Sequence, residues 1–238
     1  MPYIGQAPAP KVVTSSDLAD DVVTADKIGD TAISGFSALG SEPADTDEFL
    51  ISDAGTLKRM DYSYIKGGGT HILLATTTAS DSAQVDFTSN INSTYRAYMV
   101  DIADCRPATN DTVLYLRFYQ GGSLDTGGVY DWVQSRTCTD SSLNTKTGST
   151  NAGEIQLTFA NNNSSNASIN GRIFIYDPSN TAIDTYARSI LTYHIDGDKV
   201  LMDDGASRIE ETAAVDGFRF VFSSGNITDG VFKLYGIT

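Results

Sequence analysis

Near the start of the chain, apolar side chains recur at every fifth position, a spacing that suits neither a single helix nor a single strand. They are Leu18, Val23, Ile28 and Ile33, with mainly Asp, Thr, Ala and Gly between them. Steps of five turn a helix by about 140°, so these side chains scatter around an α-helix. They also alternate between the two faces of a strand. We therefore expect identical rungs from other copies of the chain to cover these four residues.

One short helix is the competing interpretation of this segment. Several apolar residues between positions 18 and 32 lie near helical spacing, and Ser15 or Ser16 could cap the first turn. The β-branched pair Val22-Val23, followed by Gly29, disfavours a helix. We favour an oligomeric connector.

Three consecutive glycines, Gly67-Gly68-Gly69, mark a boundary in the 238-residue chain. Such a run offers no side chain for packing, so we expect a hinge there. Before it, residues 48–52 and 57–60 flank the turn Asp53-Ala54-Gly55-Thr56 and predict a hairpin. We predict an N-terminal anchor and oligomerising linker over residues 1–34, a connector with the hairpin over 35–69, and a head domain over 70–238.

After the glycines, short apolar runs alternate with turn signals. Residues 97–102, 173–176 and 218–222 are rich in β-branched and aromatic side chains, and residues 113–119 alternate between apolar and polar. Glycine and asparagine clusters separate the runs, and no helical period lies between them. We predict an all-β fold with a C-terminal β-sandwich of jelly-roll type, preceded by a short extended or helical N-terminal segment.

The charge balance is acidic, with 16 basic and 30 acidic residues and a net charge of −14. A phosphate backbone or an anionic membrane repels such a surface, so we expect no nucleic-acid binding. No run approaches the roughly 20 apolar residues that a membrane helix needs, so we expect no membrane insertion. The start of the chain also lacks the basic and apolar regions of a secretory signal.

Side chains suited to catalysis are sparse, and we predict neither enzyme activity nor a cofactor. His71 and His194 are the only histidines, and the motifs of serine hydrolases, zinc proteases and phosphate-binding loops are absent. We expect His194 to be a half-buried strand residue. Cys105 and Cys138 provide no metal framework; they could form a disulfide, but two free structural thiols are favoured.

Acidic residues near the C-terminus allow two further readings. Asp196-Gly197-Asp198 and Asp203-Asp204-Gly205 could hold Ca²⁺ at a hairpin end, although their spacing does not match an EF-hand loop. Glu210, Glu211 and Asp216 could supply the acid and base of a glycan depolymerase. In so acidic a chain, these carboxylates are better explained as solvated surface residues. We therefore predict no metal site and no catalytic residues.

A glycan site is harder to dismiss, because sugars bind exposed aromatic rings beside short polar side chains. Tyr130 and Trp132, the only tryptophan, follow a glycine-rich loop over residues 121–128. Trp132 is more simply interpreted as a core residue. We therefore expect Tyr130 to be the exposed ring.

Several segments together resemble structural proteins of tailed bacteriophages, in particular tail fibres and related fibre-like proteins. The start Pro2-Tyr3-Ile4-Gly5-Gln6-Ala7-Pro8 is similar to the short opening of such fibres. Residues 20–33 resemble their linker repeats, and residues 47–62 resemble a segment that precedes their distal domains. Residues 222–237 are similar to the last strands of their C-terminal sandwiches.

This resemblance implies a homotrimer within the virion, made in the host cytoplasm, with the N-terminus on the particle and the sandwich facing outward. Pro2, Tyr3, Ile4 and Gly5 would then contact other virion proteins of the tail or capsid. Because the chain is short, a stubby tail fibre, an adaptor or a capsid-surface fibre fits better than a long receptor-binding fibre. The alternative is a carbohydrate-binding module that recognises a host-surface glycan.

Overall fold

The computed structural model describes residues 12, 14, 35–65, 70–197 and 199–238. The chain divides into two compact units, Met1–Gly67 and Gly68–Thr238, and the division falls within the three glycines. Both N-terminal sets of predicted residues lie outside the described residues and stay predictions: Pro2, Tyr3, Ile4 and Gly5 for attachment, and Leu18, Val23, Ile28 and Ile33 for oligomerisation.

The described part of the first unit is built around the predicted hairpin, which is confirmed. Strand β1 (Glu48–Asp53) pairs antiparallel with β2 (Thr56–Asp61), and the short 3-10 helix η3 (Tyr62–Tyr64) follows. Ala54 and Gly55 between the strands have φ angles of 49° and 86°. Positive φ at both central residues is the geometry of the two-residue turns that match the twist of paired strands. No described residue of this unit is buried.

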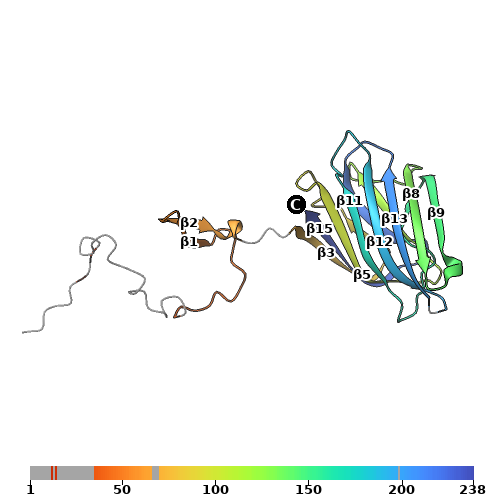
Figure 1. The fold of residues 1–238 in the computed structure, drawn as a ribbon, viewed down its shortest axis with the longest axis horizontal. Coiled ribbons are helices and arrows are strands. Elements are labelled where there is room, and N and C mark those ends of the chain that lie inside the picture. The colour runs from red at the N-terminus through yellow and green to blue at the C-terminus, as the bar shows by residue number, and fades with distance from the viewer. Residues whose placement is uncertain (1–11, 13, 15–34, 66–69, 198) are drawn as a thin grey trace, which may run out of the picture. The chain divides into compact units, whose positions relative to one another are not determined.

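The second unit contains thirteen strands in two antiparallel sheets (Figure 1). The larger sheet has the order β3 (His71–Ser82), β15 (Ile227–Ile237), β5 (Ala97–Pro107), β11 (Ile169–Tyr176), β12 (Thr185–Ile195), β13 (Lys199–Ile209), β8 (Tyr130–Cys138) and β9 (Thr145–Ala152). The smaller sheet has the order β10 (Ile155–Gln156), β6 (Leu114–Gln120), β14 (Val215–Phe222) and β4 (Val85–Phe87), with β7 (Ser123–Leu124) also paired to β6. The 3-10 helix η4 (Ser141–Leu143) lies between β8 and β9.

Aromatic side chains join the two sheets into a sandwich. Tyr98 on β5 meets Phe218 on β14 with ring centroids 6.3 Å apart, and Phe220 on β14 meets Phe232 on β15 at 5.4 Å. These rings belong to one continuous core that draws on both sheets. The expected all-β sandwich is confirmed, while the jelly-roll variety stays a prediction.

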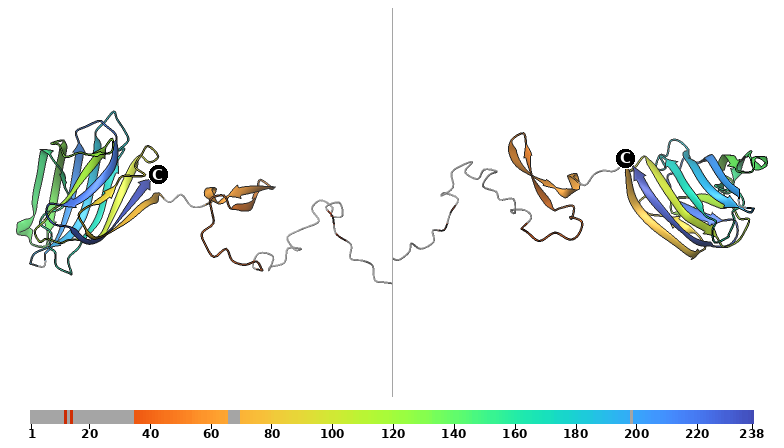
Figure 2. Two further views of the ribbon diagram at one scale, coloured as in Figure 1. Left: turned by 180° about the vertical axis from the view of Figure 1, so that it is seen from behind. Right: turned by 60° about the horizontal axis from the view of Figure 1, so that its bottom comes forward.

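The two ends of the second unit lie close together at one edge of the larger sheet. The C-terminal strand β15 pairs with both β3 and β5, and the Thr238 N–H donates to the Thr70 carbonyl. Figure 2 shows the C-terminus beside the start of β3 in both views. The last strand is therefore tied into the sheet, as its sequence pattern predicts.

Strict alternation gives the larger sheet one core face and one outer face. Along β12 every second side chain, from Thr185 to Ile195, is buried, while the intervening ones are exposed or half-buried. Burial alternates in the same way along the central part of β13. The smaller sheet covers the core face, so the outer face carries the accessible side chains of these strands.

Both cysteines are free and buried, in agreement with the favoured interpretation. Burial raises the pKa of the Cys105 thiol far above its usual range, with a smaller contribution from the nearby Asp229. Within the described ranges, no helix has the length and apolar character needed to cross a bilayer.

Candidate binding groove on the outer face of the larger sheet

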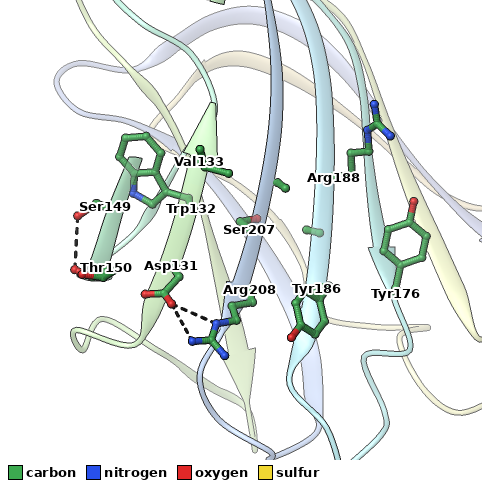
Figure 3. A pocket seen from close by; sticks show the side chains of 12 residues that line it. Asp131, Trp132, Val133, Ser149, Thr150, Tyr176, Tyr186, Arg188, Ser207 and Arg208 are labelled. Carbon is green, nitrogen blue, oxygen red and sulfur yellow. Dashed lines mark hydrogen bonds and ion pairs between the residues drawn. The ribbon is translucent and has the colours of Figure 1, made fainter. Parts of the chain in front are cut away.

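A groove of about 440 Å³ lies on the outer face of the larger sheet, over strands β11, β12, β13, β8 and β9 (Figure 3). One lateral row of paired residues crosses it, with Tyr176 opposite Tyr186, Tyr186 opposite Arg208 and Arg208 opposite Asp131. Residues in register on adjacent antiparallel strands point to the same face. The consecutive strands β11, β12 and β13, together with β8 from earlier in the chain, thus place two rings and an ion pair side by side.

The two tyrosine rings form the aromatic part of the groove. Tyr176 is 43% and Tyr186 50% exposed, and each alternates with a buried neighbour along its strand. Neither ring takes part in stacking or a hydrogen bond with the residues that the structure describes. Their faces are therefore free for a ligand.

Arg208 is held in the groove by carboxylates on three sides. Its guanidinium donates to Asp131 and Asp184, each at 2.9 Å, and also to Glu210. The Arg208 hydrogen bond is the largest cause that lowers the pKa of Asp131 below its usual range. The same contacts, with Asp131 first, raise the pKa of Arg208. Arg208 and Asp131 are both ionised at neutral pH, and three carboxylates around one guanidinium leave the cluster with a net negative charge.

A second hollow of about 300 Å³ shares Val133, Arg188 and Ala206 with the first. It extends the groove along β13 toward Asp204, whose carboxylate accepts from Arg188 at 2.9 Å, and toward Lys146 on β9. Between Arg208 and Asp204 the strand rises about 13 Å. The two hollows together, named the outer groove below, suit an elongated ligand.

Neither of the two predicted glycan-contacting rings is fully exposed. Tyr130 is fully buried, and its hydroxyl accepts from the Phe118 N–H at 3.0 Å and donates to the Asp125 carbonyl at 3.1 Å. The expectation that Tyr130 is exposed is therefore wrong, because its hydrogen bonds satisfy the hydroxyl inside the core. Burial is the main cause that raises its pKa.

Trp132 is only partly buried. It packs against the core at its edge, and its remaining surface lines the outer groove. In Figure 3 its indole lies beside Ser149, its partner across β8 and β9. The only tryptophan of the chain is thus a groove residue, which its local sequence does not distinguish from a core residue.

Of the aspartates considered for Ca²⁺, Asp198 lies outside the described residues and the other three do not converge. Asp203 is completely buried, where Arg136 donates to it at 3.2 Å and the Tyr193 hydroxyl at 2.6 Å. Asp204 points to the opposite face, and Asp196 accepts from Asn110 at 2.9 Å. Among the described residues, no group of three or more His, Cys, Asp or Glu side chains could hold a metal ion.

The carboxylates considered for glycoside cleavage also have separate partners. Glu210 accepts from Arg208, whereas Asp216 accepts from the Gly122 N–H at 2.8 Å. Glu211 lies near Asp125, and partial burial followed by this neighbour raises its pKa. Nothing in these contacts joins two of the three into an acid and base pair.

The two histidines have ordinary strand environments. His194 is half-buried on β12, as expected. His71 lies at the start of β3, where its Nδ1 is 3.0 Å from the Thr70 hydroxyl and its ring meets Tyr235 edge-on at 6.4 Å. They belong to different strands, and neither lines the outer groove.

No protein-family model, curated protein or solved structure matches this chain. Of the residues that form the outer groove, the sequence singled out only Trp132 and a part of the acidic residues. Tyr176, Tyr186, Arg188 and Arg208 carry no motif, and only the alternation along β11, β12 and β13 indicates that they are exposed.

Proposed function

We propose that this chain is a virion attachment protein of a tailed bacteriophage, a short tail fibre, adaptor or capsid-surface fibre. Its N-terminal part would bind the particle and associate with other copies into a homotrimer, and the sandwich would face outward as a non-catalytic head. One observation carries the proposal: a connector in which no described residue is buried precedes a sandwich with its own complete core.

The connector hairpin leaves apolar side chains uncovered. Leu50 is 74% and Leu57 68% exposed, and Phe49, Tyr64 and Ile65 are exposed as well. An isolated two-stranded hairpin is at best marginally stable in water, and burial of a Leu or Phe side chain is worth about 1.5–3 kcal/mol. A hairpin of this kind gains stability only from a partner that covers these side chains.

Other copies of the same chain are the simplest partner. Identical hairpins present identical apolar surfaces, and closed rotational symmetry lets each copy cover the next. The five-residue ladder of Leu18, Val23, Ile28 and Ile33 precedes the hairpin and needs the same kind of cover. A trimer would also multiply weak contacts of each head with a surface, because the heads share one local concentration.

Carbohydrate recognition is the second candidate function, and the outer groove favours it. The groove combines free aromatic faces with paired charged side chains on the accessible side of the sandwich. The two functions are compatible, because an attachment protein needs a head that recognises a surface.

The oligomeric state tests the proposed function. Light scattering on a sizing column would give the mass of the full chain and of residues 70–238, which contain a complete core. We expect a trimer for the full chain and a monomer for residues 70–238. A full chain that is monomeric at micromolar concentration would overturn the fibre proposal.

A further inference from the structure

We infer that the outer groove is a binding site for a neutral oligosaccharide, and this inference names the ligand class of the proposed attachment head. The groove has the size of a small-ligand site, because its hollows of about 440 and 300 Å³ match the usual range of about 300–1,000 Å³. The rings, the charges and the position of the groove on the sheet each favour a sugar as the ligand.

The rings offer what the apolar faces of a sugar need. Tyr176 and Tyr186 lie opposite each other on adjacent strands with their faces free, and Trp132 lines the same groove. Ring faces are electron-rich and attract the polarised C–H groups of a pyranose. Figure 3 shows the two tyrosines on one side of β13 and Trp132 on the other, with Arg208 and Asp131 close to β13.

The charges disfavour an anionic ligand. Arg208 contacts three carboxylates, those of Asp131, Asp184 and Glu210. Arg188 contacts Asp204, so neither guanidinium lacks a counter-charge and the carboxylates are in excess. Each pair still has unused N–H groups and oxygen lone pairs next to each other, because Arg has five N–H donors and a carboxylate has about four acceptor sites. A sugar hydroxyl both donates and accepts, so it can bind both members of a pair. A phosphate or an acidic polymer would compete with the carboxylates instead.

The position of the groove disfavours a peptide strand. Strands β11, β12, β13 and β8 are each paired on both sides, so their backbone groups are already used, and of the strands under the groove only β9 has an open edge in the described structure, on the side away from β8. A peptide that adds to a sheet requires an open edge with free N–H and carbonyl groups. Side chains must therefore recognise a ligand of the outer groove, as they recognise sugars.

Trp132 provides a direct readout, because it is the only tryptophan of the chain and lines the groove. The full chain would be screened on a printed array of neutral and anionic glycans, and bound glycans would be titrated while Trp132 emission is recorded. We expect a saturable change in emission with a neutral oligosaccharide. Tyr186→Ala and Tyr176→Ala should each weaken binding at least tenfold, and Tyr186→Phe should restore most of it.

The control is Tyr64→Ala, which removes a more exposed tyrosine from the connector and should leave the titration unchanged. Three results would overturn the inference: no glycan of the array binds, binding survives Tyr186→Ala, or Trp132 emission changes with protein concentration alone. The last would assign the groove to a second copy of the chain. A trimer without a sugar response overturns only this inference, whereas a sugar response in a monomer overturns only the fibre proposal.

Discussion

Two of the hairpins in the chain, β1–β2 and β12–β13, have similar turn and strand patterns in sequence but different surroundings. In β1–β2, six residue pairs flank a tight turn, and no side chain is buried. In β12–β13, eleven pairs flank the turn at Gly197, and about half of the side chains lie in the core. Turn chemistry and pairing specify a hairpin locally, but they do not make it stable by themselves. A second layer that covers the hairpin decides its stability. Of these two hairpins, only β12–β13 packs against a second sheet in the described structure.

Separation of the two units is the strongest test of this comparison. A peptide of residues 35–67 should lack the hairpin as a monomer, because it buries no apolar side chain, whereas residues 70–238 should unfold cooperatively. Circular dichroism and amide NMR spectra of both pieces would measure the difference, which we expect to be all or none. Structure that appears in the peptide only at high concentration would support association between copies. A folded monomeric peptide would contradict the comparison.

The next largest effect contrasts the two faces of one strand. Asp203→Ala would leave Arg136 buried without its counter-charge and should lower the free energy of unfolding by about 3–5 kcal/mol. Asp204→Ala removes the partner of Arg188 on the outer face and should cost about 0–1 kcal/mol. Urea unfolding of both variants gives the two values. Equal losses would show that the assignment of core and outer faces is wrong.

The fold could be predicted from the sequence wherever a strand is strongly apolar. The runs at β5, β6, β14 and β15 are such strands, and all four lie in the core of the sandwich. Strand β9, Thr145–Ala152, has no buried residue, and its composition resembles a loop. Strands β8 and β13 carry Gln134, Arg136 and Asp203 toward the core, so their alternation is hidden from a pattern that counts only apolar residues.

The outer groove could not be predicted for a related reason. Tyr176, Tyr186, Arg208 and Asp131 become neighbours only through the register of three strand pairs, which no local motif encodes. Tyr130 shows a second limit of local patterns. It is the ring expected to be exposed, but it is buried because its hydroxyl finds hydrogen-bond partners at Phe118 and Asp125 inside the core.

The smallest expected effect concerns surface ion pairs in the two units. Arg59 in the hairpin contacts one carboxylate, Glu48, whereas Arg208 in the outer groove contacts three. In the folded chain the Arg208 hydrogen bond holds the pKa of Asp131 below its usual range, so the pairing contributes stability that is fully present above the pKa of an unfolded carboxyl. This contribution is lost as the pH falls through the lowered pKa.

Arg208→Met should therefore raise the pKa of Asp131, because it removes the main cause of the lowering. The pKa would be measured by NMR titration of the side-chain carboxyl carbon, with Arg59→Met as the control that leaves it unchanged. The difference in unfolding midpoint between wild type and Arg208→Met should be small, because solvent screens exposed pairs. It should stay constant from neutral pH down to the ordinary carboxyl range and narrow as the pH falls through the lowered pKa of Asp131. An Asp131 pKa that is the same in both proteins would mean that Arg208 does not organise the groove, and the ligand site would then rest on its aromatic rings alone.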